Sequence, residues 1–126
     1  MRVGMGFDIH RLVEGRSLLL GGVKIPSAKG LLGHSDGDVL LHALCDALLG
    51  AVGAWDIGSY FPDSDPKWKG ASSQIFLEKA AELAGRKSLR VENVDAVILT
   101  EKPKLAPHRI AIQRSIAQMQ IGRAHV

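Results

Sequence analysis

The sequence has a single cysteine, no long hydrophobic run and no signal sequence. Because Cys45 has no second cysteine among the 126 residues, nothing indicates a disulfide-rich secreted scaffold. The most apolar stretch, residues 39–54, carries His42 and Asp46 and does not form a membrane span. Residues 1–6 lack the apolar core of a signal peptide. We therefore expect a cytoplasmic protein, or a plastid protein if the source is a plant, although no transit peptide is seen.

Charges of neither sign dominate the composition. Lys and Arg together number 16 and Asp and Glu 13, which gives a net charge of +3. This balance is too mild and too evenly spread to indicate nucleic acid as a partner, and it suits a small anionic ligand equally well. Hydrophobic residues make up 46% and charged residues 23%, which excludes a disordered chain and fits one globular domain.

Apolar periodicity predicts a mixture of strands and helices. Alternating residues predict strands at 2–10, at 17–25 with a bulge or turn at the Gly21-Gly22 pair, and at 91–100. Helical spacing and capping residues predict helices from Ser35 or Asp36 to about Val52, from Ser72 or Ser73 to Leu83 or Ala84, and over 107–119. This order is typical of the α/β class, as a two-layer α+β sandwich with helices on one face of a mixed sheet.

Asp8, His10 and His42 form the main candidate for a metal site. Residues two apart on a strand project to the same side, so Asp8 and His10 converge, and His42 from a buried helix adds a second imidazole. Two histidines and one carboxylate with an open fourth position are typical of a catalytic zinc. Asp46, one turn after His42, is placed to accept a hydrogen bond from its other ring nitrogen. The alternative is a hydrogen-bonded core histidine beside a polar strand face.

Three further segments are candidates for ligand binding. His34 and Ser35 precede a predicted helix, whose free N–H groups and positive dipole end favour an anion, although ordinary capping explains the same residues. The carboxylates of the long loop over 53–70 suit polyol hydroxyls or a hydrated magnesium ion, and the alternative is a solvated turn-rich loop. Segment 100–106 follows a strand end, where α/β sheets bind ligands; the alternative is a helix-leading loop with solvated lysines.

Taken together, these segments resemble one family. The matching stretches are residues 6–10, 21–26, 30–39, 42–44, 46–50, 56–58, 61–66 and 103–104. They are similar to the 2-C-methyl-D-erythritol 2,4-cyclodiphosphate synthases of the non-mevalonate isoprenoid pathway, and the resemblance runs from residue 1 to about residue 119. It implies an α+β sandwich assembled as a homotrimer, with active sites between neighbouring subunits.

The resemblance also implies a reaction. The 2-phosphate of a cytidine-diphosphate-linked methylerythritol attacks the β-phosphorus of the diphosphate, CMP leaves and a cyclic diphosphate forms. A zinc-type divalent ion is expected on Asp8, His10 and His42. A second ion, magnesium or manganese, bridges the substrate phosphates. His34 matches the residue that stabilises the transition state, and is the one catalytic side chain that the resemblance assigns.

The resemblance further assigns the residues that bind substrate. These are Asp8, Ile9, His10, His34, Ser35, Asp56, Ile57, Gly58, Phe61, Pro62, Asp63, Ser64, Asp65, Thr100, Glu101, Lys102, Pro103, Lys104, Leu105 and Ala106. Ser35 is expected to hold phosphate, and Asp56 and Gly58 are expected to bind the methylerythritol hydroxyls. Residues 100–106 are expected to form the cytidine pocket of the adjacent subunit, with Lys104 near phosphate.

Beyond about residue 119 the sequence departs from the family pattern. Members continue with a threonine-rich strand, a glycine-rich loop and a final helix, which complete the nucleotide site and the second ion site. We therefore expect one domain over residues 1–120, incomplete at its C-terminus, and a non-native tail over residues 121–126 that resembles a translated sequencing adaptor. Such a chain is expected to fold poorly and to have little activity. The alternatives are a metal-dependent phosphoesterase, with water as the nucleophile, and an inactive metal- or nucleotide-binding fragment.

Overall fold

The computed structural model describes residues 1–119 and 123–126, so the predicted boundary at residue 120 and the start of the predicted tail lie outside the described residues. The strands are β1 (Leu12–Glu14), β2 (Leu18–Leu20), β3 (Val23–Ile25), β4 (Lys29–Leu31), β5 (Asn93–Asp95) and β6 (Arg123–His125). The helices are α1 (Val39–Ala51), α2 (Ile57–Tyr60), α3 (Ser73–Arg86) and α4 (Arg109–Gln118), with 3₁₀ turns η1 (Pro66–Trp68) and η2 (Ala106–His108). The predicted α/β class is therefore confirmed.

The strands of the described residues form three two-stranded sheets. β1 pairs antiparallel with β4, and β2 pairs antiparallel with β3, so that Leu18 lies opposite Ile25. β5 pairs in parallel with β6. The Gly21-Gly22 pair makes the tight turn between β2 and β3, because both residues have positive φ (61° and 78°), which glycine adopts without strain. Of the two alternatives for this pair, a turn is correct.

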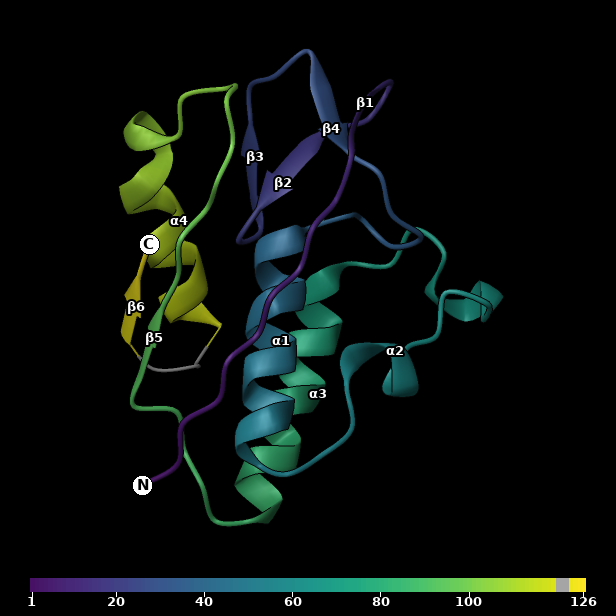
Figure 1. Cartoon of the computed structure of the whole chain (residues 1–126). Coiled ribbons are helices and arrows are strands. Elements are labelled where there is room, and N and C mark those ends of the chain that lie inside the picture. Colours follow the sequence, from purple (N-terminus) through teal and green to yellow (C-terminus); the bar gives the residue numbers. More distant parts are fainter. Residues whose placement is uncertain (120–122) are drawn as a thin grey trace.

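Two predicted strands are wrong in part. Segment 1–10 runs alongside α1 and carries no strand, and the strand predicted at 91–100 is limited to β5 (Figure 1). Alternation of apolar residues predicts an extended chain, but a strand also needs a partner for its N–H and C=O groups. The side chains of Met5 and Phe7 are 91% and 78% exposed, so the apolar face that the alternation marks lies at the surface.

The core lies between α1, α3 and the β2–β3 hairpin, with α4 packed on the hairpin. α1 and α3 lie side by side along most of their length (Figure 1). Leu41 and Leu77 are at most 1% exposed, as are Ile112 and Ile116 of α4. At the Gly21 turn a Cβ would lie 2.9 Å from Ile112 Cγ2, so only glycine allows α4 to pack this closely. No described helix combines the length and apolarity that a membrane crossing requires.

The helix boundaries differ most at the start of α1. The predicted caps Ser35 and Asp36 are wrong, because Gly37 has φ of +77° and the helix begins after Asp38. The Asp38 carboxylate caps α1 by accepting the Leu41 N–H (3.1 Å). α3 begins as predicted, with Ser72 as its N-cap, but continues past Gly85 to Arg86. The long loop over 53–70 contains α2 and η1.

Candidate metal centre

Close packing of segment 1–10 against α1 brings the predicted metal ligands together. A Cβ on Gly6 would lie 1.9 Å from the Ala43 carbonyl oxygen, so the segment approaches the helix backbone at a distance that only glycine permits. Ala43 directly follows His42 in the chain, and Asp8 lies two residues after Gly6. The contact therefore places Asp8 beside the helix turn that carries His42.

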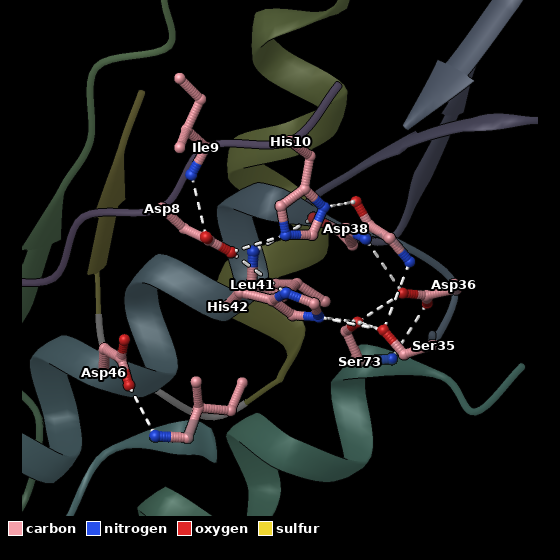
Figure 2. Close-up of polar contacts among 12 residues, drawn as sticks. Asp8, Ile9, His10, Ser35, Asp36, Asp38, Leu41, His42, Asp46 and Ser73 are labelled. Atoms are coloured by element: carbon pink, nitrogen blue, oxygen red, sulfur yellow. Dashed lines mark hydrogen bonds and ion pairs between the residues drawn. The ribbon is translucent and has the colours of Figure 1, made fainter. Parts of the chain in front are cut away.

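Asp8, His10 and His42 meet at one point (Figure 2). Asp8 Oδ2 lies 2.9 Å from His10 Nε2 and 3.2 Å from His42 Nδ1. Within the described part of the chain this is the one group of ligand-type side chains that is close enough to hold a metal, with one ligand atom from each within 4.8 Å of the others. The predicted convergence is confirmed, although the segment that carries Asp8 and His10 is not a strand.

The donor set fits a zinc-type ion. Two imidazole nitrogens and one carboxylate oxygen are the ligands of catalytic zinc sites with an open fourth position. Neighbouring ligands of a tetrahedral zinc stand about 3.3 Å apart when the metal–ligand distances are about 2.0–2.1 Å. The distances of 2.9 and 3.2 Å from Asp8 to the two imidazoles are close to that spacing. A divalent metal therefore fits these three side chains.

The charges of the triad are coupled. The hydrogen bond to the Asp8 carboxylate raises the pKa of His10 above its ordinary value, despite partial burial. Burial by itself raises the pKa of Asp8, but the hydrogen bonds from His10 and from the Ile9 N–H help to outweigh it, and that pKa lies well below its usual range. A metal ion needs the neutral imidazole, so binding of the ion displaces a proton from His10.

Backbone contacts fix the orientation of His10. Its Nδ1 lies 3.1 Å from the Gly37 carbonyl oxygen. A carbonyl oxygen only accepts hydrogen bonds, so Nδ1 donates and the lone pair of the neutral ring is on Nε2, the nitrogen that faces Asp8. His42 faces Asp8 through Nδ1, whereas its Nε2 lies 3.1 Å from Ser35 Oγ and 2.8 Å from Ser73 Oγ.

Asp46 does not orient His42, so this prediction is wrong. Its carboxylate accepts the backbone N–H of Ile57 (2.8 Å) at the start of α2. The i,i+4 spacing places Asp46 and His42 on one face of α1, but it does not decide which group each side chain contacts. The partner of the second imidazole nitrogen is Ser73 from α3, which was predicted only as an alternative helix cap.

The N-terminus of α1 carries a buried carboxylate, and anion binding by His34 and Ser35 stays a prediction. Asp38 is fully buried and accepts the N–H groups of Gly21 (3.0 Å) and Gly22 (2.7 Å) besides that of Leu41. Its carboxylate therefore occupies the end of α1, and burial raises its pKa. His34 and Ser35 lie in the preceding loop.

A cavity of about 530 Å³ opens beside the triad. It brings together most of the predicted site residues of the first half of the chain: Asp8, Ile9, His10, His34, Ser35, His42, Ile57, Gly58, Phe61, Pro62 and Asp63. His34 is held at its wall, because its Nε2 donates to the Asp65 carbonyl oxygen (2.9 Å). The loop before α1 is also tied to the segment that precedes α3, since Gly70 N–H donates to the His34 carbonyl (2.7 Å).

The remaining predicted residues lie outside the lining of this cavity. Asp56 caps α2, where it accepts the Ser59 N–H (2.8 Å), and Asp65 caps η1. Ser64 lies in the chain between Asp63, which lines the cavity, and Asp65. Thr100 lines a second hollow of about 570 Å³ between α1 and segments 4–10 and 95–100, which shares Asp8, Ile9 and His10 with the cavity beside the triad. Glu101, Lys102, Pro103, Lys104, Leu105 and Ala106 line neither of these two hollows.

Comparison with known sequences identifies relatives over the whole chain. The YgbB family matches residues 1–126. The 2-C-methyl-D-erythritol 2,4-cyclodiphosphate synthase of Synechococcus sp. (strain JA-2-3B'a(2-13)) is 56% identical over 127 residues, which cover 100% of this chain and 81% of the relative. The enzyme of the same name from Aquifex aeolicus (strain VF5) is 53% identical over 119 residues, which cover 94% of this chain and 76% of the relative.

Solved structures agree with these relatives. A CDP-bound 2C-methyl-D-erythritol-2,4-cyclodiphosphate synthase superposes with a TM-score of 0.82 at 42% identity, covering 98% of this chain and 87% of that chain. The bifunctional IspDF from Campylobacter jejuni superposes with a TM-score of 0.84 at 38% identity, covering 98% of this chain and 35% of that chain. The chain therefore belongs to the YgbB family, and the relatives that it resembles are named 2-C-methyl-D-erythritol 2,4-cyclodiphosphate synthases.

Proposed function

We propose that this chain is a metal-dependent 2-C-methyl-D-erythritol 2,4-cyclodiphosphate synthase, a lyase of isoprenoid biosynthesis by the non-mevalonate pathway. The observation that carries the proposal is the meeting of Asp8, His10 and His42 at the rim of a cavity that also contains His34 and Ser35. This arrangement places a cation site beside groups that suit a phosphate. Family membership and the CDP-bound relative support the same substrate class.

The reaction needs positioning and charge neutralisation more than covalent help from the protein. An oxygen of the 2-phosphate forms a bond to the β-phosphorus, the bond from the β-phosphorus to the bridging oxygen breaks, and CMP leaves with the negative charge. No base is required, because the attacking phosphate oxygen is already an anion. A divalent ion on Asp8, His10 and His42 would polarise a diphosphate oxygen and neutralise its charge. His34, with Nε2 anchored on Asp65, would direct its other edge at the developing charge.

The finer assignments follow from the family resemblance. We propose a zinc-type ion at the triad, a magnesium or manganese ion between the substrate phosphates, and methylerythritol hydroxyls on Asp56 and Gly58, with Ser35 on phosphate. The placement of residues 101–106 away from the cavity of their own chain supports a cytidine pocket shared with a neighbouring copy. Exposed apolar side chains such as Val97 (83%) and Leu99 (89%) support a homotrimer. A cytoplasmic location stays a prediction.

The decisive experiment incubates the purified protein with its CDP-linked substrate in ¹⁸O-labelled water. Any turnover should give CMP and a cyclic diphosphate without ¹⁸O, and should stop after chelation of the metal. A phosphate product that contains ¹⁸O would show a phosphoesterase, and zinc and CMP binding without turnover would show a binding fragment. Light scattering on the same sample tests the trimer, and turnover by the 126-residue chain tests the prediction that its domain is incomplete.

A further inference from the structure

Ser73 occupies an unusual place for the first residue of a helix. It is fully buried (0% exposed), whereas the capping of α3 is done by its neighbour Ser72, which accepts the Gln74 N–H. The Ser73 hydroxyl is therefore free for other contacts. It lies 2.8 Å from His42 Nε2 and also contacts a carboxylate oxygen of Asp36 (Figure 2).

The chemistry of these groups fixes the direction of each hydrogen bond. A carboxylate accepts hydrogen bonds and does not donate them, so the Ser73 hydroxyl must donate to Asp36 Oδ1. The same carboxylate accepts the Ser73 backbone N–H through Oδ2 (3.0 Å), and this second hydrogen bond fixes the position of Ser73 relative to Asp36. A hydroxyl has one hydrogen, and that hydrogen is used. Ser73 Oγ is therefore an acceptor toward His42, and His42 Nε2 carries the hydrogen that it donates.

A neutral imidazole with its hydrogen on Nε2 has its lone pair on Nδ1. In His42 that nitrogen is the one 3.2 Å from Asp8 Oδ2, at the point where the triad meets. His10 is held in the opposite tautomer by the Gly37 carbonyl, so both rings direct a lone pair at the same point. We propose that Ser73, held by Asp36, is a positioning residue that fixes the metal-binding tautomer of His42. This inference rests on the proposed metal site, but not on the identity of the substrate.

Ser35 does not replace Ser73 in this role. Its hydroxyl lies farther from His42 Nε2 (3.1 Å) and also accepts the Gly37 N–H (3.3 Å). Ser35 lines the cavity and is a proposed phosphate ligand, whereas Ser73 does not belong to the cavity lining. Ser73 therefore contacts neither substrate nor metal and acts through His42. In the metal-free protein Asp8 faces Nδ1 of His42 and competes with Ser73 for the imidazole hydrogen. The effect of Ser73 is therefore measurable as the position of that hydrogen.

The test compares Ser73→Ala with the control Ser72→Ala, which removes the neighbouring hydroxyl from an exposed position. Zinc affinity is measured by competition with a chelator. Loss of an outer partner of a metal-bound histidine typically weakens metal binding about 10–100-fold, and we expect a loss of this size in Ser73→Ala alone. Ser73→Thr, which keeps the hydroxyl, should restore most of the affinity.

A second measurement does not depend on zinc. Nitrogen-15 NMR of the metal-free protein at alkaline pH reports which nitrogen of His42 carries the hydrogen. We expect Nε2–H in the unchanged protein and a shift toward Nδ1–H in Ser73→Ala, because Asp8 is then the stronger acceptor. An unchanged zinc affinity in Ser73→Ala, or Nδ1–H in the unchanged protein, overturns the inference. Zinc bound through His42 without formation of a cyclic product would instead refute the proposed reaction and leave the role of Ser73 standing.

Discussion

His42 Nδ1 lies 3.2 Å from Asp8 Oδ2, although 34 residues separate the two in the sequence. The contact joins a helix to an extended segment that has no strand partner among the described residues. It depends on tight backbone packing and on the cap of α1, and each of these supports can be tested by itself. The following predictions separate the metal chemistry of the triad from the packing that builds it.

Replacement of His42 should abolish metal binding. His42→Ala removes one of the three candidate ligands, so the loss of zinc affinity should exceed the about 10–100-fold loss expected for an outer partner. Zinc content by mass spectrometry measures the effect, and His108→Ala serves as the control because His108 is not part of the triad. One equivalent of zinc retained by His42→Ala would falsify the ligand assignment.

The stability of the metal-free protein should fall as pH rises past neutrality. Asp8 raises the pKa of His10 above the model-peptide value of 6.5, so the charged pair stabilises the fold below pH 6.5. This stabilisation is lost as pH rises through the higher pKa of the folded protein. At low pH the stabilisation by the pair is limited by protonation of Asp8, whose lowered pKa keeps the carboxylate charged until strongly acidic pH.

Thermal unfolding in the presence of a chelator measures this effect across the pH range. His10→Gln keeps a polar side chain but cannot titrate, so the loss of stability above pH 6.5 should be much smaller in that variant. Identical pH profiles for the two proteins would show that the His10–Asp8 pair does not contribute.

Asp38→Ala should destabilise the fold strongly. It leaves the buried N–H groups of Gly21 and Leu41, and the part-buried N–H of Gly22, without their acceptor. Each orphaned buried donor costs roughly 1–3 kcal/mol, so the two buried donors lead us to expect a loss of about 2 kcal/mol or more in the free energy of unfolding. Urea denaturation measures it, with the exposed Glu14→Ala as the control and Asp38→Asn as an intermediate case. A loss below about 1 kcal/mol, the ordinary effect of removing one N-cap, would contradict this account.

Gly6→Ala should weaken both the fold and the metal site. The added Cβ would lie 1.9 Å from the Ala43 carbonyl oxygen, so segment 1–10 must move away from α1 and carry Asp8 and His10 with it. Gly50→Ala is the matched control, because Gly50 lies in α1 with no atom within 4 Å of the added Cβ. That control should gain about 0.5–1 kcal/mol of stability from the helix preference of alanine. Equal zinc affinity in both variants would exclude the packing as the source of the site geometry.

Local signals account for the parts of the fold that the sequence predicts well. The Ser72 cap and the apolar periodicity after it place α3, and the glycine pair places the β2–β3 turn. The metal triad follows from the Asp-x-His pattern with a histidine on a buried helix, and the structure brings these side chains together. The helix cap, the glycine turn and the Asp-x-His pair are each contained in a few neighbouring residues, and only His42 comes from a distant position.

Contacts between distant segments account for what sequence reasoning missed. α1 begins at Val39 because Asp38 binds the hairpin turn at Gly21 and Gly22, which no local pattern shows. Asp46 bonds to Ile57, and Ser73 comes from another helix to meet His42. Alternation also cannot show whether an extended segment finds a partner, and segment 1–10 has none among the described residues.

The two imidazoles of the triad reach their meeting point by different edges. Nδ1 is bonded to the ring carbon next to the side-chain stem, whereas Nε2 lies at the far side of the ring. Because His42 uses Nδ1 and His10 uses Nε2, the meeting point lies closer to the backbones that carry His42 and Asp8 than to the backbone that carries His10. A bound cation would thus be tied most directly to α1 and to Asp8, so a displacement of either backbone would move it, whereas His10 reaches it across the width of its ring.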